Sequence, residues 1–502
     1  MTSSNYQTDA VDLDSTYIVG NDPNYIGIQS AVTNRKTVVF GQQLLTQTYP
    51  IGNLNNAINY AQTLPGIAVD QDSTVITGVG PTAVFYKSRA NASQNLIRAN
   101  FSLAENYPQT LLWLTNPLIN WSSPVQVGAL SNWTQVSSSA TNTQISFALQ
   151  NNGTLWSCGY GGRGALGNNS TALSNPSFGQ YTIGPDATGP IRSWAQVASG
   201  QSFTIATQSN GTLWAWGTSS SYGEAGLNTT ANCSSPAQIG TASNWSKIAC
   251  SYLATGAIQS NGSLWVWGQN RYGNLGNNSS NISTGFSSPI QVGSLSLWTS
   301  ITVGTQNMLA IQSNGTLWAW GSNGWGVIGN NTSSNVFSSP VQVGSALWTQ
   351  ISCGYTSVVG IQSNGTLWGW GANSFGPVGT TLAFAYSSPI QIGTSSTWVQ
   401  VSVGGRNTMA IQSNGTLWAW GCNSFGQLGI NNNSTTLIVS TPVQVGSLSN
   451  WSRVAVATGY ALAIQSDGTL WVWGNNSYAN GTYGNLGLTP TANSVTKITY
   501  GL

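Results

Sequence analysis

The 502-residue sequence contains no histidine and few charged residues. Asp, Glu, Lys and Arg make up 4% of the chain, whereas an ordinary soluble domain has about a quarter. The absence of histidine removes the commonest general base and metal ligand. The net charge of +2 is too small to attract a phosphate backbone. The composition therefore argues against nucleic-acid binding, and we expect neither a metal nor a cofactor.

The sequence also lacks paired cysteines and long apolar runs. Five cysteines lie far apart, with no C-x-x-C motif, and we interpret them as small apolar residues rather than as disulfide partners. The first residues, MTSSNYQTDAVDLD, have no basic segment followed by an apolar run, so we expect no classical signal peptide. No apolar stretch approaches the roughly eighteen residues of a membrane span. We therefore expect no transmembrane segment.

Glycine and tryptophan are abundant, with 59 and 23 residues respectively, and the aromatic content excludes a disordered chain. One phrase recurs seven times, as LWSCG, LWAWG, LWVWG, LWAWG, LWGWG, LWAWG and LWVWG. Its first tryptophans are Trp156, Trp214, Trp265, Trp318, Trp368, Trp418 and Trp471. An apolar run joined by Asn-Gly or Asp-Gly precedes each phrase, which predicts a hairpin with a type I′ turn.

Two further strands complete each repeat. A tryptophan-led segment such as WTQV at Trp133 precedes the hairpin, and W-G-x-N-x-x-G-x-L-G followed by S-P-V-Q-V-G comes after it. Four short strands in each of seven units predict an all-β, seven-bladed β-propeller over residues 116–502. We expect residues 1–115, which lack the repeat, to form a small mixed or β-rich module. Within it, TVVFG, STVITG and TAVFYKS suggest strands, and NLNNAINYAQTL suggests a short helix.

The tryptophans and the ring closure each allow two interpretations. Packing between blades is the simpler explanation of the repeated tryptophans, and a ladder of sugar-stacking platforms is the alternative. The S-P-V-Q-V-G strand at 123–128 and the final VTKITYGL at 495–502 occupy the same phase of the repeat. One of these two segments is expected to complete a blade begun at the other end of the chain, which would remove an exposed sheet edge.

The pattern W-G-x-N-x-x-G-x-L-G with a proline-marked strand and a G-T-L-W-x-W-G hairpin resembles the repeat of the regulator of chromosome condensation family. The clearest copies are WGQNRYGNLG at 267–276 and WGCNSFGQLG at 420–429. The resemblance implies the propeller fold, while that family includes a nucleotide-exchange factor, secreted enzyme inhibitors and many scaffolds. Residues 116–502 carry three acidic and seven basic residues, too few for an exchange factor's charged face.

Local divergence within the uniform repeats marks a candidate site. Between the tryptophan-led strand and the hairpin, the loops read SGQSFT, CSYLAT, GTQNML, GYTSVV, GGRNTM and ATGYAL. We expect them to form one composite ligand-binding surface comprising Gln201, Tyr252, Gln306, Asn307, Tyr355, Arg406, Asn407 and Tyr460. Amides, tyrosines and one arginine suit a sugar or a polar protein surface. Drift of solvent-exposed loops is the alternative explanation.

A second set of variable loops follows each L-G, and drift explains it more simply than function. Trp325 stands where other repeats have Tyr or Phe, and we interpret it as a larger packing residue. The Asn-x-Ser/Thr sequons coincide mostly with the hairpin turns, so we expect turn formation rather than glycosylation. No paired-carboxylate, nucleophile-base or phosphate-loop motif appears, so no catalytic residue is expected.

These observations favour a non-enzymatic structural or adhesive protein of a virus particle, such as a phage appendage. Its N-terminal module would attach to other virion proteins, and its propeller would be displayed to bind a host surface glycan or protein. The expected location is the virion surface or the extracellular space. A secreted or cell-surface lectin-like or inhibitor-like propeller is the alternative, and an enzyme using the propeller axis is the least favoured. The sequence leaves open whether the chain forms a homo-oligomer.

Overall fold

The computed structural model describes most of residues 121–476, together with Gly484, Leu486 and the backbone of seven strands between residues 16 and 99. Within 121–476 the undescribed residues are 140–143, 172–173, 181–192, 221, 281–284, 295, 334, 382–383 and 432–437. The chain divides into two compact units. The first comprises Met1–Asn116 with Pro490–Thr496, and the second comprises Pro117–Thr489 with Lys497–Leu502.

The first unit contains an antiparallel sheet whose seven strands are paired in chain order. The strands are β1 (Thr16–Val19), β2 (Ile26–Ser30), β3 (Lys36–Val39), β4 (Ile67–Asp70), β5 (Val75–Gly78), β6 (Ala83–Tyr86) and β7 (Ile97–Ala99). Strands β3, β5 and β6 fall on the three segments expected to be extended. The expected helix at 53–64 lies outside the described residues.

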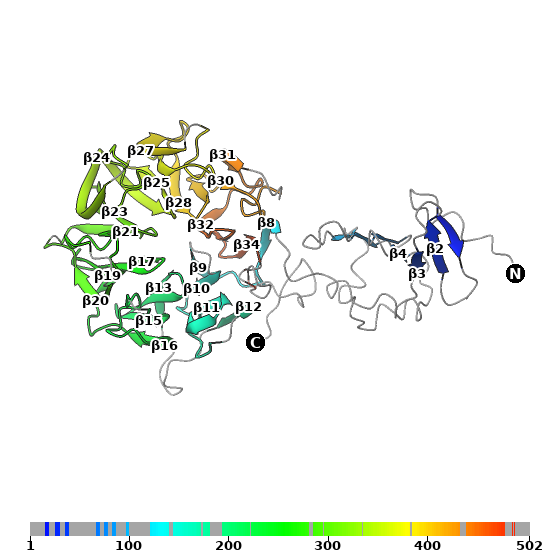
Figure 1. The fold of residues 1–502 in the computed structure, drawn as a ribbon, viewed down its shortest axis with the longest axis horizontal. Coiled ribbons are helices and arrows are strands. Elements are labelled where there is room, and N and C mark those ends of the chain that lie inside the picture. The colour runs from blue at the N-terminus through cyan, green and yellow to red at the C-terminus, as the bar shows by residue number, and fades with distance from the viewer. Residues whose placement is uncertain are drawn as a thin grey trace. The chain divides into compact units, whose positions relative to one another are not determined.

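The second unit is a propeller of seven antiparallel, four-stranded blades around a central axis (Figure 1). Blade 1 contains β9 (Trp133–Ser138), β10 (Ile145–Gln150), β11 (Leu155–Tyr160) and β12 (Ser174–Gln180). Blade 2 contains β13 (Trp194–Ser199), β14 (Phe203–Gln208), β15 (Leu213–Gly217) and β16 (Cys233–Gln238). Blade 3 contains β17 (Trp245–Ser251), β18 (Ala254–Gln259), β19 (Leu264–Gln269) and β20 (Gly285–Gln291).

The remaining blades repeat this order. Blade 4 contains β21 (Trp298–Val303), β22 (Asn307–Gln312), β23 (Thr316–Ser322) and the first part of β24 (Val336–Cys353). Blade 5 uses the second part of β24, then β25 (Ser357–Gln362), β26 (Leu367–Ala372) and β27 (Ala385–Gln391). Blade 6 contains β28 (Trp398–Val403), β29 (Asn407–Gln412), β30 (Leu417–Cys422) and β31 (Ile438–Gln444). The predicted seven-bladed propeller is confirmed.

Blade 7 closes the ring with a strand from the other end of the propeller sequence. It contains β32 (Trp451–Val456), β33 (Tyr460–Gln465), β34 (Leu470–Gly474) and β8 (Trp121–Gln126). Strand β8 pairs antiparallel with β34, with Trp471 opposite Gln126, and its cyan ribbon lies beside β34 in Figure 1. The S-P-V-Q-V-G segment therefore completes the last blade. The final VTKITYGL lies outside the described residues.

The hairpin between the second and third strands differs from the predicted type I′ turn. In blade 2 the Gly211 N–H donates to the Gln208 carbonyl at 2.9 Å, and Gly211 has a φ of +79°, whereas Asn210 is not in the left-handed region. This pattern indicates a three-residue loop with glycine at its left-handed position. The Asn210 Oδ1 accepts hydrogen bonds from the Thr212 N–H at 3.1 Å and the Thr212 hydroxyl at 2.7 Å. The asparagine is therefore a side-chain acceptor, which explains why Asp467 replaces it in blade 7.

The repeated tryptophans pack between blades. The second tryptophan of each LWxWG phrase is fully buried, and its ring N–H donates to a carbonyl of the preceding blade. For example, Trp267 donates to the Glu224 carbonyl at 3.0 Å and Trp420 donates to the Pro377 carbonyl at 2.8 Å. The strand-opening tryptophans pack edge-on against the first hairpin tryptophans, as in Trp245 and Trp265 with ring centroids 6.2 Å apart. Full burial confirms the packing role for the second tryptophan of the phrase.

Part of the second loop set also links the blades. In blades 1, 2, 3, 4 and 6 an asparagine two residues after the last glycine of the W-G-x-N-x-x-G-x-L-G motif has a positive φ, and its N–H donates to the outer strand of the next blade, as from Asn228 to the Ser287 carbonyl at 2.7 Å. None of the five cysteines, all of which lie among the described residues, forms a disulfide bond. The helical content of the described residues is one short 3₁₀ turn, Gly162–Gly164, and none of their helices could cross a membrane.

Candidate functional site

The turns between the first and second strands of the blades lie near the axis, at one end of the propeller. The first strands are the innermost ones, because each contacts the first strands of both neighbouring blades (Figure 1). Antiparallel pairing places the loop after the third strand at this same end, and the hairpin turns at the opposite end. We call these the turn end and the hairpin end.

Five of the eight predicted site residues reach the surface at the turn end. Gln201, Tyr252, Gln306 and Tyr355 are partly exposed, and Arg406 is exposed. Neighbouring turns also bond to each other, since the Gln201 N–H donates to the Tyr252 carbonyl at 3.2 Å. These five residues come from blades 2 to 6, and we call them the turn surface.

The other three predicted residues are buried and do not belong to the surface. Asn307, Asn407 and Tyr460 are the first residues of the second strands, with exposed fractions of 2%, 0% and 1%. The Tyr460 hydroxyl donates to the Ile145 carbonyl at 2.8 Å, which joins blade 7 to blade 1. Burial raises the pKa of Tyr460 well above its usual range. The predicted loops therefore extended into the second strands, whose first residues are buried.

A hydrogen bond that passes over blade 6 orders part of the turn surface. The Thr458 hydroxyl in blade 7 donates to the Tyr355 hydroxyl in blade 5 at 3.1 Å. Gly405 of blade 6 lies between them, and a Cβ there would come within 2.5 Å of the Thr458 Oγ1 and 2.9 Å of the Tyr355 ring. The absence of a side chain at Gly405 therefore allows Tyr355 of blade 5 to reach across blade 6 to Thr458.

Aromatic residues in the loops after the third strands extend this surface, and sequence reasoning missed them as site residues. They occupy the position before the first glycine of G-x-L-G. We call them the loop aromatics: Tyr222, Tyr272, Trp325, Phe375 and Phe425. Trp325, Phe375 and Phe425 are 50%, 38% and 41% exposed, so the expectation that Trp325 is a packing residue is wrong. A bulky aromatic recurring at one exposed phase of the repeat is the signal that could have identified them.

Arginine side chains accompany the loop aromatics. The Arg406 guanidinium carbon lies 4.2 Å from the centroid of the Phe375 ring, and that of Arg271 lies 5.4 Å from the Tyr272 ring. Arg163 occupies the loop-aromatic position in blade 1. The described residues at the turn end include no exposed carboxylate, because Glu224 is buried and Asp467 lies at the hairpin end. The turn end is therefore aromatic, amide-rich and weakly positive.

Glu224 is a buried carboxyl in the loop after the third strand of blade 2. Its Oε2 accepts a hydrogen bond from the Ser220 hydroxyl at 2.8 Å, whereas its Oε1 is buried without a hydrogen-bond partner. Burial raises the pKa of Glu224, and hydrogen bonds to the carboxyl, together with the nearby Arg163 charge, partly oppose the shift. In blade 6 the equivalent Gln427 accepts a hydrogen bond from the Phe425 N–H at 2.8 Å. The position supports the loop rather than forming a charged site.

The described residues hold no arrangement suited to metal binding or nucleophilic catalysis. Among them, no group of three or more Asp, Glu or Cys side chains is placed to hold a metal ion. Burial raises the pKa of the Cys353 thiol to about 12, and it raises the pKa values of Cys158 and Cys250 as well. Such thiols remain protonated at neutral pH and are poor nucleophiles.

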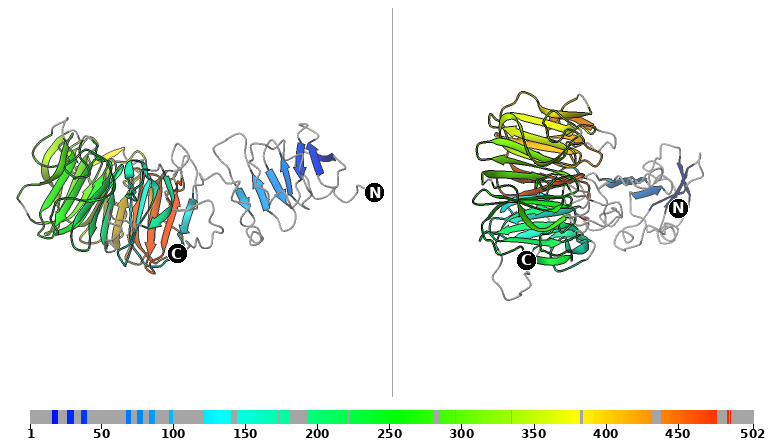
Figure 2. Two further views of the ribbon diagram at one scale, coloured as in Figure 1. Left: turned by 90° about the horizontal axis from the view of Figure 1, so that it is seen from below. Right: turned by 60° about the vertical axis from the view of Figure 1, so that its left-hand side comes forward.

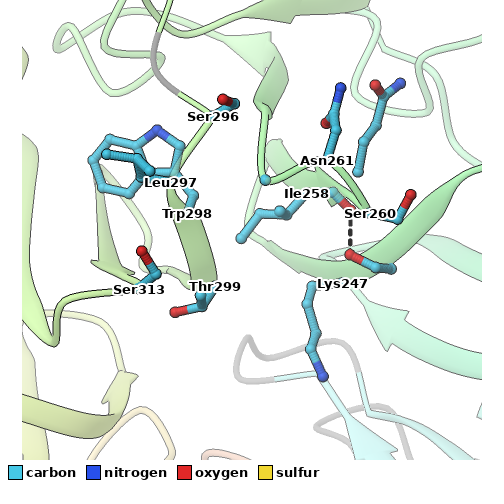
Figure 3. Close-up of a pocket in the computed structure, with 12 residues that line it drawn as sticks. Lys247, Ile258, Ser260, Asn261, Ser296, Leu297, Trp298, Thr299 and Ser313 are labelled. Carbon is cyan, nitrogen blue, oxygen red and sulfur yellow. Dashed lines mark hydrogen bonds between the residues drawn. The ribbon is translucent and has the colours of Figure 1, made fainter.

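A shallow pocket of about 410 Å³ lies at the hairpin end, between blades 3 and 4. Serine and amide side chains line it together with Leu297 and Trp298, and the ammonium group of Lys247 points away from Asn261 (Figure 3). None of the turn-surface residues contributes to it. The pocket is therefore separate from the turn surface.

Comparison with known proteins agrees with this architecture. The family model of the Regulator of chromosome condensation (RCC1) repeat matches residues 210–258, 261–311, 314–361, 364–411 and 414–464, and a second model of the same repeat matches 348–376 and 398–427. The ultraviolet-B receptor UVR8 of Arabidopsis thaliana is 30% identical over 151 residues, which are 29% of this chain and 33% of the receptor. The matched part thus spans about a third of the receptor's length.

Solved structures show the same fold. Human WBSCR16 is similar with a TM-score of 0.58 and 18% identity, over 70% of this chain and 89% of that protein. Prp20p from Saccharomyces cerevisiae is similar with a TM-score of 0.57 and 16% identity, over 72% of this chain and 92% of that protein. The repeat matches and the shared propeller together establish that the chain belongs to the regulator of chromosome condensation (RCC1) repeat family.

Proposed function

We propose that the chain is a non-enzymatic binding protein that contacts its partner through the turn surface and the loop aromatics. The observation that carries this proposal is the Arg406 guanidinium stacked 4.2 Å from the Phe375 ring, at the end where Trp325 is half exposed. Tyrosine, tryptophan and arginine are the residues most enriched at the energetic centres of protein interfaces. Such side chains would not be expected to recur at one solvent-facing phase of the repeat through drift alone.

Membership in the RCC1 repeat family supports a binding role. Prp20p is described with binding properties to Gsp1p and histones, and yeast RCC1 (Prp20) has been solved bound to Kap60. The described turn end of this chain carries few charges, so its partner is best matched by uncharged polar groups. A cell-surface glycan or a polar protein surface has this chemistry.

In its more specific form, the proposal places the propeller on a virus particle, with residues 1–115 attached to other virion proteins. The supporting observations are the 4% charged residues and a composition rich in Gly, Asn, Ser, Thr and Trp. A secreted or cell-surface lectin-like or inhibitor-like protein is the competing proposal. Mass spectrometry and imaging of purified particles distinguish the two, because absence of the chain from particles eliminates the virion form.

The binding surface is tested by replacing Tyr252, Tyr355 and Arg406 together with alanine. Binding to a glycan array and to host-cell surface protein is measured for the wild type and the variant. The matched control is Asp467→Asn, which lies at the hairpin end and restores the residue found in other hairpins. Loss of binding in the triple variant alone supports the proposal. Unchanged binding by a folded triple variant rules out the turn surface.

A further inference from the structure

The inner strands of the propeller leave one backbone edge facing the axis, without a further strand to pair with it. Buried backbone N–H and C=O groups need partners, so this edge must be capped by other groups. Side chains from the preceding blade provide the caps. Gln135 of blade 1 accepts from the Val197 N–H at 3.3 Å and lies 3.5 Å from the Val197 carbonyl, to which it donates.

The same capping recurs around the ring. Gln196 donates to the Ser246 carbonyl at 2.6 Å, and Gln350 accepts from the Val401 N–H at 2.9 Å. Hydroxyls two residues further along act in the same way, as Ser352 accepts from the Val403 N–H at 3.0 Å. The channel wall is therefore built of amides and hydroxyls that lie along the edge of the next inner strand.

Three blades depart from this pattern at the glutamine position: blade 4 carries Ser300 there, and the other two carry a cation. Lys247 occupies it in blade 3 and Arg453 in blade 7, opposite Ile258 and Ile464 respectively, and both side chains are exposed. Gln350 stands in the same register, opposite Ile361. The two cations therefore lie at one level of the channel, in blades three or four steps apart around a ring of seven.

Contacts place the Arg453 guanidinium on the channel wall. Its Nη1 donates to the Ser452 carbonyl at 3.1 Å. Ser452 is equivalent to Ser246, whose carbonyl receives the Gln196 cap in blade 3. In the preceding blade the Gln400 Oε1 is buried without a hydrogen-bond partner, so the usual cap is disturbed where the arginine lies. The Lys247 side chain also extends away from the hairpin residues around the pocket (Figure 3).

No carboxylate balances these two cations on the inner strands. The seven strands, all described, carry Gln, Ser, Thr and apolar residues besides Lys247 and Arg453. Lysine and arginine side chains are long and flexible, so both can extend from the inner strands towards the axis. Like charges facing a confined, amide-lined space attract a counter-ion.

We propose that the axial channel binds a small inorganic oxyanion, of the size of phosphate or sulfate, between Lys247 and Arg453. The guanidinium supplies a forked donor, the ammonium supplies a point charge, and the glutamine amides supply further N–H donors. This site is separate from the turn surface and does not depend on its proposed function.

The experiment compares the wild-type chain with Lys247→Gln, Arg453→Gln and the double variant. Glutamine is the residue that four other blades carry at this position, so the substitutions preserve the repeat. Thermal melting and isothermal titration calorimetry are carried out with sodium phosphate, and with sodium chloride at equal ionic strength. Arg271→Gln, an exposed arginine outside the channel, is the matched control.

Phosphate is expected to raise the Tm of the wild type and of Arg271→Gln in a saturable manner, and more than chloride does. Each single channel variant should bind phosphate severalfold more weakly, and the double variant should show no saturable binding. Without phosphate, the double variant should melt at or above the wild-type Tm, because the like-charge repulsion is removed. An equal response to phosphate in the wild type and the double variant, or no response in the wild type, overturns the proposal.

Discussion

The Thr458 hydroxyl reaches the Tyr355 hydroxyl at 3.1 Å although the two residues belong to blades separated by a third. The bond depends on the missing side chain of Gly405, where a Cβ would approach the Thr458 Oγ1 to 2.5 Å. Gly405 thus helps to fix the positions of Tyr355 and Thr458, although Gly405 itself need not contact a bound protein or glycan.

Gly405→Ala should therefore displace Tyr355 and Thr458. We expect a loss of about 1–3 kcal/mol in the free energy of unfolding, the usual result of overpacking. Urea denaturation measures this loss. Gly324→Ala is the control, because a Cβ at Gly324 meets nothing within 4 Å and its φ is not in the left-handed region. Equal stabilities of the two variants would show that the hydrogen bond between Thr458 and Tyr355 does not require residue 405 to lack a side chain.

The hairpin asparagines should be replaceable by aspartate but not by alanine. Asn414 accepts hydrogen bonds from the Thr416 N–H at 3.1 Å and the Thr416 hydroxyl at 2.7 Å. Asn414→Ala removes both bonds and is expected to cost about 1–2 kcal/mol, whereas Asn414→Asp keeps an acceptor in place. Thermal denaturation at pH 7 compares them. A type I′ turn would instead make the backbone conformation of Asn414 decisive, and both variants would then be destabilised.

Replacing the buried carboxyl of Glu224 should stabilise the protein at neutral pH. Burial raises its pKa above the ordinary value of 4.5. The contribution of this carboxyl to folding stability is therefore full below pH 4.5 and is lost as the pH rises through the raised pKa. Glu224→Gln, which copies Gln427 of blade 6, should raise the Tm at pH 7 and leave it nearly unchanged at pH 3. A lower Tm at pH 7 would indicate that the carboxylate charge is needed.

The buried thiols should resist alkylation in the folded protein and weaken its stability in alkali. With a pKa of about 12 instead of 9.0, the thiolate fraction of Cys353 at pH 8 falls about a thousandfold. Iodoacetamide labelling followed by mass spectrometry should detect Cys353 modification only after unfolding. Because the folded pKa is raised, this thiol's contribution to stability is present below pH 9 and is lost as the pH rises towards 12. Cys353→Ala should reduce that alkaline loss.

The link between the last and first blades should depend on Tyr460. Its hydroxyl donates to the Ile145 carbonyl at 2.8 Å, and the Ser139 N–H also donates to this carbonyl. The carbonyl thus keeps one partner in Tyr460→Phe, and we expect a loss of about 1 kcal/mol in the free energy of unfolding. Chemical denaturation measures it. The Tyr460 hydroxyl also accepts a hydrogen bond from the Ser146 hydroxyl at 3.2 Å. A loss several times larger would show that the hydroxyl organises more of this interface than these two hydrogen bonds.

The repeat made the blades predictable, because residues such as Trp267 and Trp420 recur in phase with the strands they occupy. The local turn was harder to predict: Asn-Gly fits both a two-residue and a three-residue loop, and only the Gln208 to Gly211 hydrogen bond distinguishes them. Asn307 and Asn407 are buried because the second strands begin at these residues, within the segments that vary between repeats. The stacking of Arg406 on Phe375 joins two blades, and comparison within single repeats does not reveal it.

Strand β8 has a mechanical consequence, because it completes blade 7 and follows directly after residues 1–116 in the chain. Tension applied through residues 1–116 reaches the pairing of β8 with β34 before it reaches the pairing of any other two strands of the propeller. The pairing of β8 with β34 is therefore the first strand pairing in the ring to bear this tension. Its strength, rather than that of an average blade, sets the force at which a tethered propeller opens.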